Sequence, residues 1–446
     1  MKKLNYFKMA AMAAAVSLTA CNNDDDNNVT DNNNGSSVVA EANTEMPADY
    51  DFGVERTIQY TASNVTVNHD AVTVDGGTAT IRQAGTYRLS GNSTDAHIVV
   101  DAGANDNVRI ILDGVNLSNN YAPVLEVKNA YKVILRAEQG TQSTLADGAG
   151  NGGSATISSN TKLTIFGTGK VTVKGNDTDA IYSKGGVILK ETDLVLNAKG
   201  DGVETDYNVD VLSGTITANT DGSVINATTV TRVNGGELSF MGKQNGIETG
   251  VYTQSGGRLL ISGNGNGIVA SSTDTSAAPV TVSNGYLYIN VPQNGIESSG
   301  SIVTSGGTVI VAGNTASGKM AVKHAGAFDV SGGTLLVAGP TSGLSSTSTQ
   351  NVITVNYPAT MAANTLMSLQ NTALESLMVV RPDYEYNSIT VSSDQIRDGG
   401  IYRIFTGGQA GGTLENCMYT PPTGYAGGQL AATFTVQNKV TVVNAE

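Results

Sequence analysis

The sequence predicts an all-β protein: a right-handed parallel β-helix, which is a solenoid, followed by a small C-terminal β-rich cap. Three observations support this prediction. Short runs rich in β-branched residues alternate with glycine and asparagine turns from Val108 to about Gly339. The turns recur at a spacing that is typical of solenoid repeats. No amphipathic helical stretch of useful length interrupts the series, so a leucine-rich horseshoe is disfavoured.

One series of turns carries an Asp or Asn shortly before an aliphatic residue. These acidic or amide residues follow one another at spacings of 22, 20, 24, 21 and 28: Asp179, Asp201, Asp221, Asn245, Asn266 and Asn294. A second series, of the Ser-Gly-Gly-Thr type, lies on the far side of each repeat, as in residues 305–308 and 331–334. Coils of about 22 residues with two or three short strands fit a parallel β-helix, whose coils stack about 4.8 Å apart.

The turn residues have a structural explanation that covers the asparagines better than the aspartates. Asn tolerates left-handed backbone, a following Gly removes the Cβ penalty, and stacked Asn side chains can hydrogen-bond from coil to coil. Asp179, Asp201 and Asp221 fit this explanation less well, because stacked like charges repel. We therefore expect a group that neutralises them.

The N-terminal segment indicates export. Lys2, Lys3 and Lys8 precede a short apolar stretch that ends at Leu18-Thr19-Ala20-Cys21, which resembles a lipobox. We expect residues 1–20 to be a lipoprotein signal peptide and Cys21 to carry the lipid, including palmitate. A plain secretory signal with a chance cysteine is the alternative.

The remaining chain divides into three parts by composition. Residues 21–54 form an acidic and Asn-rich tether with too little apolar surface to fold. Residues 55–339 form the β-helix and residues 340–446 the cap. The acidic triplet after Cys21 favours an outer-membrane lipoprotein exposed at the cell surface, and a periplasmic spacer is the alternative. Cys417 has no partner cysteine and is expected to be a buried, inert thiol.

The charge narrows the partners. The formal net charge is −14, and removal of the three lysines of the signal lowers it to −17. Nucleic acid is excluded as a partner because no basic stripe displaces its counterions. An anionic polysaccharide is unfavourable unless a divalent cation lies between the two partners.

Motifs in a fixed order then give a family resemblance. Ala84-Gly85-Thr86-Tyr87-Arg88-Leu89-Ser90-Gly91 opens a pattern that continues in residues 98–103, 108–114, 127–130, 140–148 and 163–169. The pattern resembles the bacterial carbohydrate-binding β-helix family, founded on a clostridial surface protein that binds cellulose and pectin and related in fold to pectate lyases. The resemblance runs from about residue 60 to the C-terminus. It implies a calcium-dependent, non-catalytic protein that binds plant cell-wall or acidic polysaccharides.

Strand alternation suggests where the metal and the sugar bind. Because Asp gives way to Asn after Asp221, calcium is expected at the dense cluster of carboxylates between residues 177 and 221: Asp177, Asp179, Asp201, Glu204, Asp206 and Asp221. A stripe of outward side chains would bind the sugar, with aromatic rings stacking on it: Tyr182, Tyr207, Tyr252, Glu248 and Glu297. In the competing interpretation, the acids merely cap solvated turns and the tyrosines are scattered over a solvated face.

The sequence gives little support for catalysis. No motif of the pectin hydrolases occurs in it. A pectate-lyase-like activity is the main alternative, with Lys184 or Arg232 as the base. A structural or adhesive surface protein that contacts host proteins is a further alternative.

Overall fold

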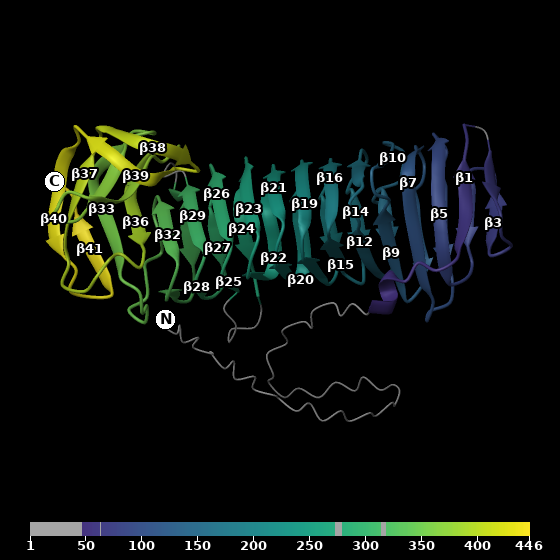
Figure 1. The fold of residues 1–446 in the computed structure, drawn as a ribbon, viewed down its shortest axis with the longest axis horizontal. Coiled ribbons are helices and arrows are strands. Elements are labelled where there is room, and N and C mark those ends of the chain that lie inside the picture. Colours follow the sequence, from purple (N-terminus) through teal and green to yellow (C-terminus); the bar gives the residue numbers. More distant parts are fainter. Residues whose placement is uncertain (1–46, 63, 273–278, 314–317) are drawn as a thin grey trace, which may run out of the picture. The chain divides into compact units, whose positions relative to one another are not determined.

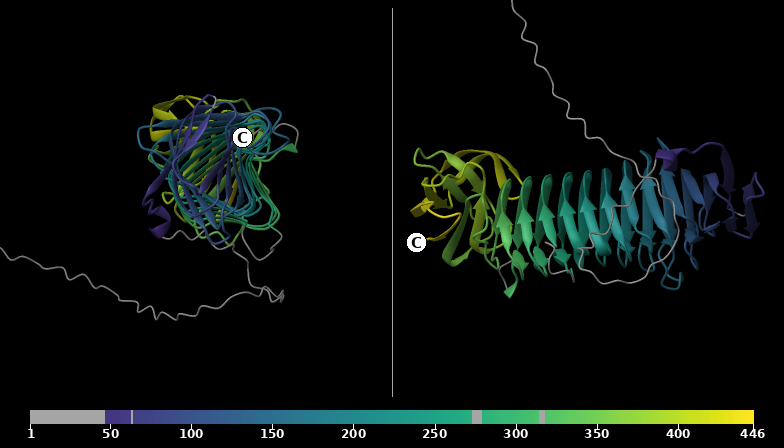
Figure 2. Two further views of the ribbon diagram at one scale, coloured as in Figure 1. Left: turned by 90° about the vertical axis from the view of Figure 1, so that its right-hand side faces the viewer. Right: turned by 90° about the horizontal axis from the view of Figure 1, so that it is seen from below.

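The computed structural model describes residues 47–62, 64–272, 279–313 and 318–446, which are nearly all β-structure without an α-helix. Most strands stack side by side in successive coils (Figure 1), which superpose when viewed along the stack (Figure 2). The predicted parallel β-solenoid is therefore confirmed. No helix formed by the described residues is long and apolar enough to span a lipid bilayer.

Each coil contributes to three parallel ladders of strands, which are numbered here. Ladder 1 contains the second half of β7 (Asn107–Asn119) and then β10 (Gln142–Asp147), β13 (Lys170–Gly175), β16 (Thr192–Ala198), β19 (Gly214–Thr220), β21 (Glu237–Gly242), β23 (Arg258–Gly263), β26 (Tyr286–Val291), β29 (Thr308–Gly313) and β32 (Thr334–Ala338).

Ladder 2 follows ladder 1 within each coil. It contains β4 (Thr78–Ile81), β6 (His97–Asp101), β8 (Leu125–Asn129), β11 (Ile157–Ser159), β14 (Ile181–Ser183), β17 (Val203–Thr205), the first parts of β20 (Ile225–Val233) and β22 (Asn245–Gln254), β24 (Asn266–Ala270), β27 (Ile296–Ser298) and β30 (Val322–His324).

Ladder 3 completes the coil. It contains β1 (Glu55–Tyr60), β5 (Gly85–Ser93), the first half of β7, β9 (Lys132–Ala137), β12 (Lys162–Phe166), β15 (Val187–Lys190), β18 (Asn208–Val211), the second parts of β20 and β22, β25 (Val280–Val282), β28 (Ile302–Thr304) and β31 (Phe328–Val330).

Aliphatic side chains from the three ladders fill the interior. In ladder 2, one inward position is occupied in register by Ile181, Val203, Ile225, Ile247, Ile268 and Ile296, all at most 2% exposed. Each side chain lies about 4.8 Å from the equivalent one in the next coil, so burial is continuous along the stack. This continuous core explains why no single coil needs a core of its own.

Glycines after the Asp and Asn residues have a different role from the one expected. Gly202 and Gly246 do not adopt positive φ. A Cβ at Gly246 would lie 2.3 Å from Cγ2 of Ile261, and one at Gly202 would lie 2.6 Å from the carbonyl oxygen of Val224. Close approach of neighbouring groups, rather than left-handed backbone, therefore requires glycine at these positions. The left-handed explanation holds for the second series of turns, as at Gly307, where φ is 72°.

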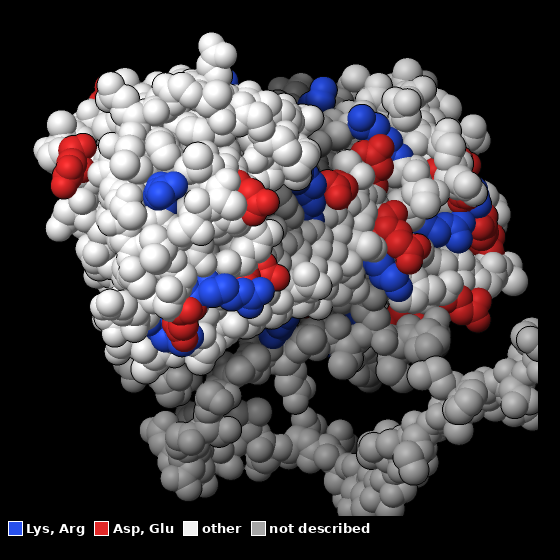
Figure 3. All heavy atoms as spheres, turned by 60° about the vertical axis from the view of Figure 1, so that its left-hand side comes forward, with Lys and Arg blue, Asp and Glu red and all other residues white. Residues whose placement is uncertain are grey.

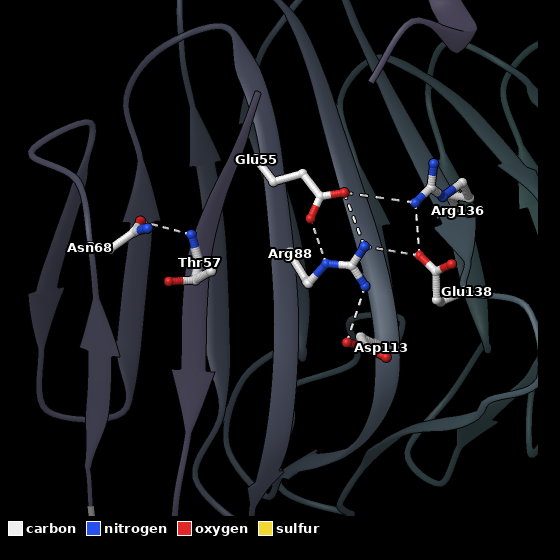
Figure 4. Close-up of polar contacts among 7 residues, drawn as sticks. All are labelled: Glu55, Thr57, Asn68, Arg88, Asp113, Arg136 and Glu138. Atoms are coloured by element: carbon white, nitrogen blue, oxygen red, sulfur yellow. Dashed lines mark hydrogen bonds and ion pairs between the residues drawn. The ribbon is translucent and has the colours of Figure 1, made fainter. Parts of the chain in front are cut away.

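The N-terminal end is held by a network of charged side chains. Two short strands pair antiparallel with the first strands of the solenoid: β2 (Val65–Val67) pairs with β1, and β3 (Val72–Asp75) pairs with β4. Arg88 on β5 bonds to Glu55 at 2.6 and 2.9 Å, to Asp113 at 3.0 Å and to Glu138 at 3.2 Å (Figure 4). The bidentate bond to Arg88 lowers the pKa of Glu55.

Residues 47–54 lie across the outer face of ladder 3, and we call them the strap. The strap begins with the 3₁₀ helix η1 (Pro47–Tyr50). Its Asp49 forms a buried ion pair with Lys132, with an Nζ–Oδ2 distance of 2.8 Å. Phe52 packs beneath the guanidinium of Arg136, 4.4 Å from its ring centroid. The strap thereby covers part of the outer face of the first coils.

The C-terminal region contains two groups of strands. β33 (Val352–Met361) pairs with β36 (Tyr386–Ser392) and with β41 (Val440–Asn444), and β36 also pairs with β32, which covers that edge of ladder 1. A separate six-stranded antiparallel sheet has the order β38 (Gln409–Glu415), β39 (Met418–Ala426), β35 (Ser376–Val380), β34 (Met367–Gln370), β37 (Ile401–Thr406) and β40 (Gln429–Thr435). The predicted β-rich cap is confirmed.

The tip of the β38–β39 hairpin contacts the outer face of ladder 1. Glu415 pairs with Arg258 at 2.5 Å, and the Asn416 amide donates to the Tyr286 hydroxyl at 2.9 Å. Cys417 beside it is free and buried, and burial raises the pKa of its thiol to about 11. A thiol held so far from ionisation is a poor nucleophile, as predicted.

Candidate functional site

A row of polar side chains occupies the turn between ladders 1 and 2, one residue from each coil. We call this row the polar ladder, and its members are Asp179, Asp201, Ser223, Asn245, Asn266 and Asn294. Backbone amides or side-chain amides of one coil donate to the side chain of the preceding coil. The Asp201 amide donates to Oδ1 of Asp179 at 2.5 Å, and Nδ2 of Asn266 donates to Oδ1 of Asn245 at 2.9 Å. The predicted hydrogen bonding from coil to coil is therefore observed.

A second row points outward from ladder 2, three residues after each member of the polar ladder. We call it the outward stripe, and strand register aligns its members as Tyr182, Glu204, Asn226, Glu248, Val269 and Glu297. The positions expected for Tyr182, Glu204, Glu248 and Glu297 agree with this register. The stripe and the polar ladder run side by side along the solenoid.

In two coils the polar ladder holds an Asn whose amide donates to a glutamate of the outward stripe. Nδ2 of Asn245 donates to Oε2 of Glu248 at 2.9 Å. Nδ2 of Asn294 donates to Oε2 of Glu297 at 2.8 Å, and Lys323 also pairs with Glu297, which lowers the pKa of that carboxyl. Each of these glutamates thus has a donor for its charge.

The coil that contains Asp201 and Glu204 lacks such a donor at the equivalent position. Asp201 stands where Asn245 stands two coils later, and a carboxylate has no proton to give to Glu204. Ligand atoms of Asp179, Asp201 and Glu204 all lie within 4.8 Å of one another. We call these three residues the acidic rung. Among the described residues, no Lys, Arg or His forms an ion pair with any of the three.

Electrostatics of the acidic rung follow from this crowding. Burial, followed by the hydrogen bond and charge of Asp179, raises the pKa of Glu204 to about 7. Burial also raises the pKa of Asp201, although the Asn226 amide and the Ser223 backbone amide donate to it and work in the opposite direction. Without a cation, the rung reduces its repulsion by keeping a proton near neutral pH.

The geometry suits calcium. Two oxygens bound to one calcium ion at about 2.3–2.6 Å lie at most about 5 Å apart, which agrees with the 4.8 Å spread of the rung. All three residues offer carboxylate oxygens, which a hard cation prefers. These three residues would hold the ion, and water or a sugar would supply further oxygens.

The other three predicted ligands lie outside the rung. Asp206 accepts from the Tyr182 hydroxyl at 3.1 Å, and its charge acts on Glu204 without joining the cluster. Asp177 accepts from the backbone amide of Gly153 at 2.8 Å. Asp221 pairs with Lys243 at 2.6 Å. The structure therefore groups three of the six predicted residues.

The prediction that Asp221 stacks on Asp179 and Asp201 is wrong. Val203 pairs with Ile225, so each residue of this coil matches the one 22 positions later, and Ser223 rather than Asp221 stands above Asp201. Asp221 lies two residues earlier, just after β19, with 52% of its side chain exposed. Solvent and Lys243, rather than a shared ion, stabilise its charge.

The three tyrosines predicted to bind sugar differ in their exposure to solvent. Tyr182 lies on the outward stripe and is partly exposed, and Tyr207 is partly exposed in the turn between β17 and β18. Tyr252 cannot contact a ligand at the surface, because it is 0% exposed and its hydroxyl donates to Gln254 within the core. The first part of β22 belongs to ladder 2 and its second part to ladder 3. The bend between the two parts changes which side chains face inward, so Glu248 points outward but Tyr252 points into the core.

Sequence reasoning missed the partners that distinguish one coil from another. Asn226, Ser223 and the amides of Asn245 and Asn294 were not recognised as neutralising groups. The signal was present in a recurring tetrapeptide, Asn-Gly-Ile-Glu at 245–248 and 294–297 against Asp-Gly-Val-Glu at 201–204. Asp in place of Asn at the first position of this tetrapeptide marks the acidic rung.

The fold and the two rows define a parallel β-solenoid with an outward stripe of mostly polar residues and a carboxylate cluster. Residues 75–314, a range that contains the acidic rung, match the carbohydrate-binding domain-containing protein family. The chain belongs to this family. The resemblance identified from the motifs is thereby confirmed.

One protein and one solved structure are similar to parts of this chain. A carbohydrate-binding domain-containing protein of Acetivibrio thermocellus is 31% identical over 122 residues, which cover 26% of this chain and 43% of that protein. The match thus spans less than half of the relative. The solved structure of a polysaccharide lyase-like protein from C. thermocellum, a gadolinium derivative, is 20% identical with a TM-score of 0.41, over 62% of this chain and 97% of that one. So distant a likeness adds nothing to the assignment.

Proposed function

We propose that the protein binds acidic or plant cell-wall polysaccharide along the outward stripe, with calcium held by Asp179, Asp201 and Glu204. The uncompensated acidic rung is the observation that carries this proposal. Two later coils stabilise their glutamates with Asn amides, whereas this coil concentrates carboxylates that a cation would stabilise. Membership of a carbohydrate-binding family supports a glycan as the ligand.

Calcium gives an acidic protein a way to bind an acidic glycan. The chain carries a formal charge of −14, so a uronate chain is repelled unless a cation lies between them. An ion bound by three protein carboxylates retains coordination positions for sugar oxygens. Tyr182 stands next to Glu204 in the stripe and offers an aromatic face for a sugar ring.

The proposal is a binding function without catalysis. For a lyase, Lys184 or Arg232 would act as base. Arg232 lies on ladder 3, bound to Asp210 at 2.9 Å, whereas the rung lies at the turn into ladder 2. A calcium-dependent rise of near-ultraviolet absorbance on incubation with pectin would establish lyase activity and overturn the binding-only proposal.

Glycoside hydrolysis is a second candidate, favoured by one observation. A carboxyl with a pKa raised to about 7, within 4.8 Å of two further carboxyls, resembles the acid and base pair of glycosidases. Release of reducing ends from a glycan that the protein binds, abolished by Glu204→Gln, would support this candidate. Absence of reducing ends would leave binding alone.

We propose that the chain reaches its ligand from the outer membrane, as a lipoprotein anchored through Cys21 and exposed at the cell surface. Cys21 and the acidic tether lie outside the described residues. Metabolic labelling with a fatty acid should label the wild type but not Cys21→Ser. Protease treatment of intact cells should remove the protein; survival of the labelled protein would indicate a periplasmic orientation.

Isothermal titration with hexagalacturonate in calcium and then in EDTA tests the central proposal. Binding should require calcium and should be lost in the double variant Asp201→Asn, Glu204→Gln. Asp221→Asn is the matched control, because it removes a carboxylate that pairs with Lys243 and lies outside both the rung and the outward stripe. Equal binding in calcium and EDTA, or equal loss in both variants, would contradict calcium at the rung.

A further inference from the structure

A cavity of about 540 Å³ lies where the solenoid meets the C-terminal strands. Residues 340–344 form one wall, and they extend ladder 2 beyond β30 through a parallel bridge between Val322 and Thr341. The β36–β33–β41 sheet forms the floor. We call this cavity the terminal pocket. It lies outside the matched family region, residues 75–314, and far along the chain from the acidic rung.

The floor of the terminal pocket combines hydroxyl, amide and aliphatic groups. Thr354 and Asn356 alternate along β33, and Val442 beside them on β41 is paired in register with Thr354. Two of these side chains remain available to a ligand: Val442 is 61% exposed, and Asn356 has a long contact of 3.5 Å to Asn444, whereas the Thr354 hydroxyl shares a hydrogen bond with Thr390 at 3.0 Å.

The lining carries no charge. Its eleven residues are Pro, Thr, Gly, Leu, Asn, Tyr, Ser and Val, without a Lys, Arg, His, Asp or Glu among them. Figure 3, with the C-terminal side brought forward, shows broad uncharged areas between isolated charged groups.

These properties select the ligand by chemistry. An anion would find no cation in the pocket, and a cation would find no carboxylate. A purely apolar ligand would leave the Thr, Asn and Ser groups without hydrogen bonds, which is unfavourable. A neutral sugar satisfies both kinds of group, because its hydroxyls donate and accept while its C–H faces pack on Leu344 and Val442. The volume is within the usual range of about 300–1,000 Å³ for small-molecule sites.

We infer that the terminal pocket is a second carbohydrate site, which binds uncharged sugar residues without calcium. The site does not depend on the proposed calcium site and differs from it in ligand charge. A polysaccharide with neutral and acidic stretches would contact the middle of the solenoid at the acidic rung and its C-terminal end at the terminal pocket. Two weak contacts on one chain strengthen each other through effective concentration.

Titration with neutral hexasaccharides of β-1,4-glucan, β-1,4-xylan and β-1,4-mannan in EDTA tests this inference. At least one should bind, and Val442→Trp, which fills the pocket, should weaken that binding about tenfold or more. Leu430→Trp is the matched control, because Leu430 is 55% exposed on β40 and does not line the pocket. Asn387→Trp, at a second exposed lining position, serves if Val442→Trp does not fold.

The outcomes separate the two sites. Neutral sugar binding should persist in Asp201→Asn, Glu204→Gln, while hexagalacturonate binding should persist in Val442→Trp. Failure of all three neutral sugars to bind in EDTA, or binding that is indifferent to Val442→Trp and Asn387→Trp, would overturn the terminal pocket. Neither result depends on whether calcium binds at the acidic rung.

Discussion

Asn245 donates a hydrogen bond to Glu248 at 2.9 Å, across a spacing of three residues that recurs from Asp201 to Glu204. The backbone frame is the same in the two coils, and the difference is one atom: an amide nitrogen replaces a carboxylate oxygen. Where the amide is present the pair is satisfied, whereas the carboxylate of Asp201, together with Asp179 in the preceding coil, gives Glu204 a cluster that needs a proton or a metal ion. The proposed function is an interpretation of this difference.

Asp201→Asn should abolish the response of the protein to calcium. The new amide can neutralise Glu204 as Asn245 neutralises Glu248, and it removes one ligand. Calcium at about one hundred times its dissociation constant should stabilise the wild type by about 2.7 kcal/mol. Thermal melting in calcium and in EDTA measures the difference. Asp221→Asn is the control and should keep the response, since Asp221 pairs with Lys243 away from the rung.

Glu204→Gln should change the pH dependence of stability in EDTA. The folded state raises the pKa of Glu204 from 4.5 to about 7, so it holds the proton more tightly than the unfolded chain does. This contribution to stability is fully present below about pH 4.5 and is lost as the pH rises through about 7. The wild type should therefore lose stability relative to Glu204→Gln between those values. Denaturant unfolding at pH 5 and pH 8 measures it, and parallel profiles for the two proteins would contradict the raised pKa.

Tyr252→Ala should lower the stability of the fold, whereas Tyr182→Ala should weaken glycan binding and leave stability nearly unchanged. Tyr252 is fully buried, so its truncation leaves a cavity and should destabilise the fold by about 3–5 kcal/mol. Tyr182 is partly exposed, and within the described part of the chain its hydroxyl bonds to exposed Asp206, so its truncation should leave the melting temperature nearly unchanged and weaken glycan binding. Melting and titration of both variants provide the comparison. Undiminished glycan affinity in Tyr182→Ala would remove this residue from the sugar site.

Lys132→Met should loosen the strap. Asp49 and Lys132 are both buried, and removal of the cation leaves the Asp49 carboxylate without its ion-pair partner. The expected loss of unfolding free energy is about 3–5 kcal/mol. The double variant Asp49→Leu, Lys132→Met should recover much of that loss, because no buried charge then remains. Chemical denaturation of the wild type, the single and the double variant gives the coupling.

Local patterns in the sequence were sufficient to predict the solenoid. The turn spacing predicts coils of about 22 residues, and alternation predicts inward Ile181, Val203, Ile247 and Ile296, which are buried as expected. Both signals depend on neighbours a few residues apart, because a strand must turn every second side chain toward the core. The outward positions of Tyr182, Glu204, Glu248 and Glu297 follow from the same rule.

Only the tertiary structure decided which of these residues meet. The pairing of Val203 with Ile225 places Ser223 above Asp201 and leaves Asp221 outside the stack, although Asp221 resembles the other turn residues in sequence. The bend within β22 turns Tyr252 inward, which alternation along one strand cannot predict. The sequence by itself determined the repeat, the strands and the faces, because these depend on local backbone geometry. Register between coils and the donors around each carboxylate depend on contacts more than 20 residues apart, and those contacts select Asp179, Asp201 and Glu204 from the six acidic candidates.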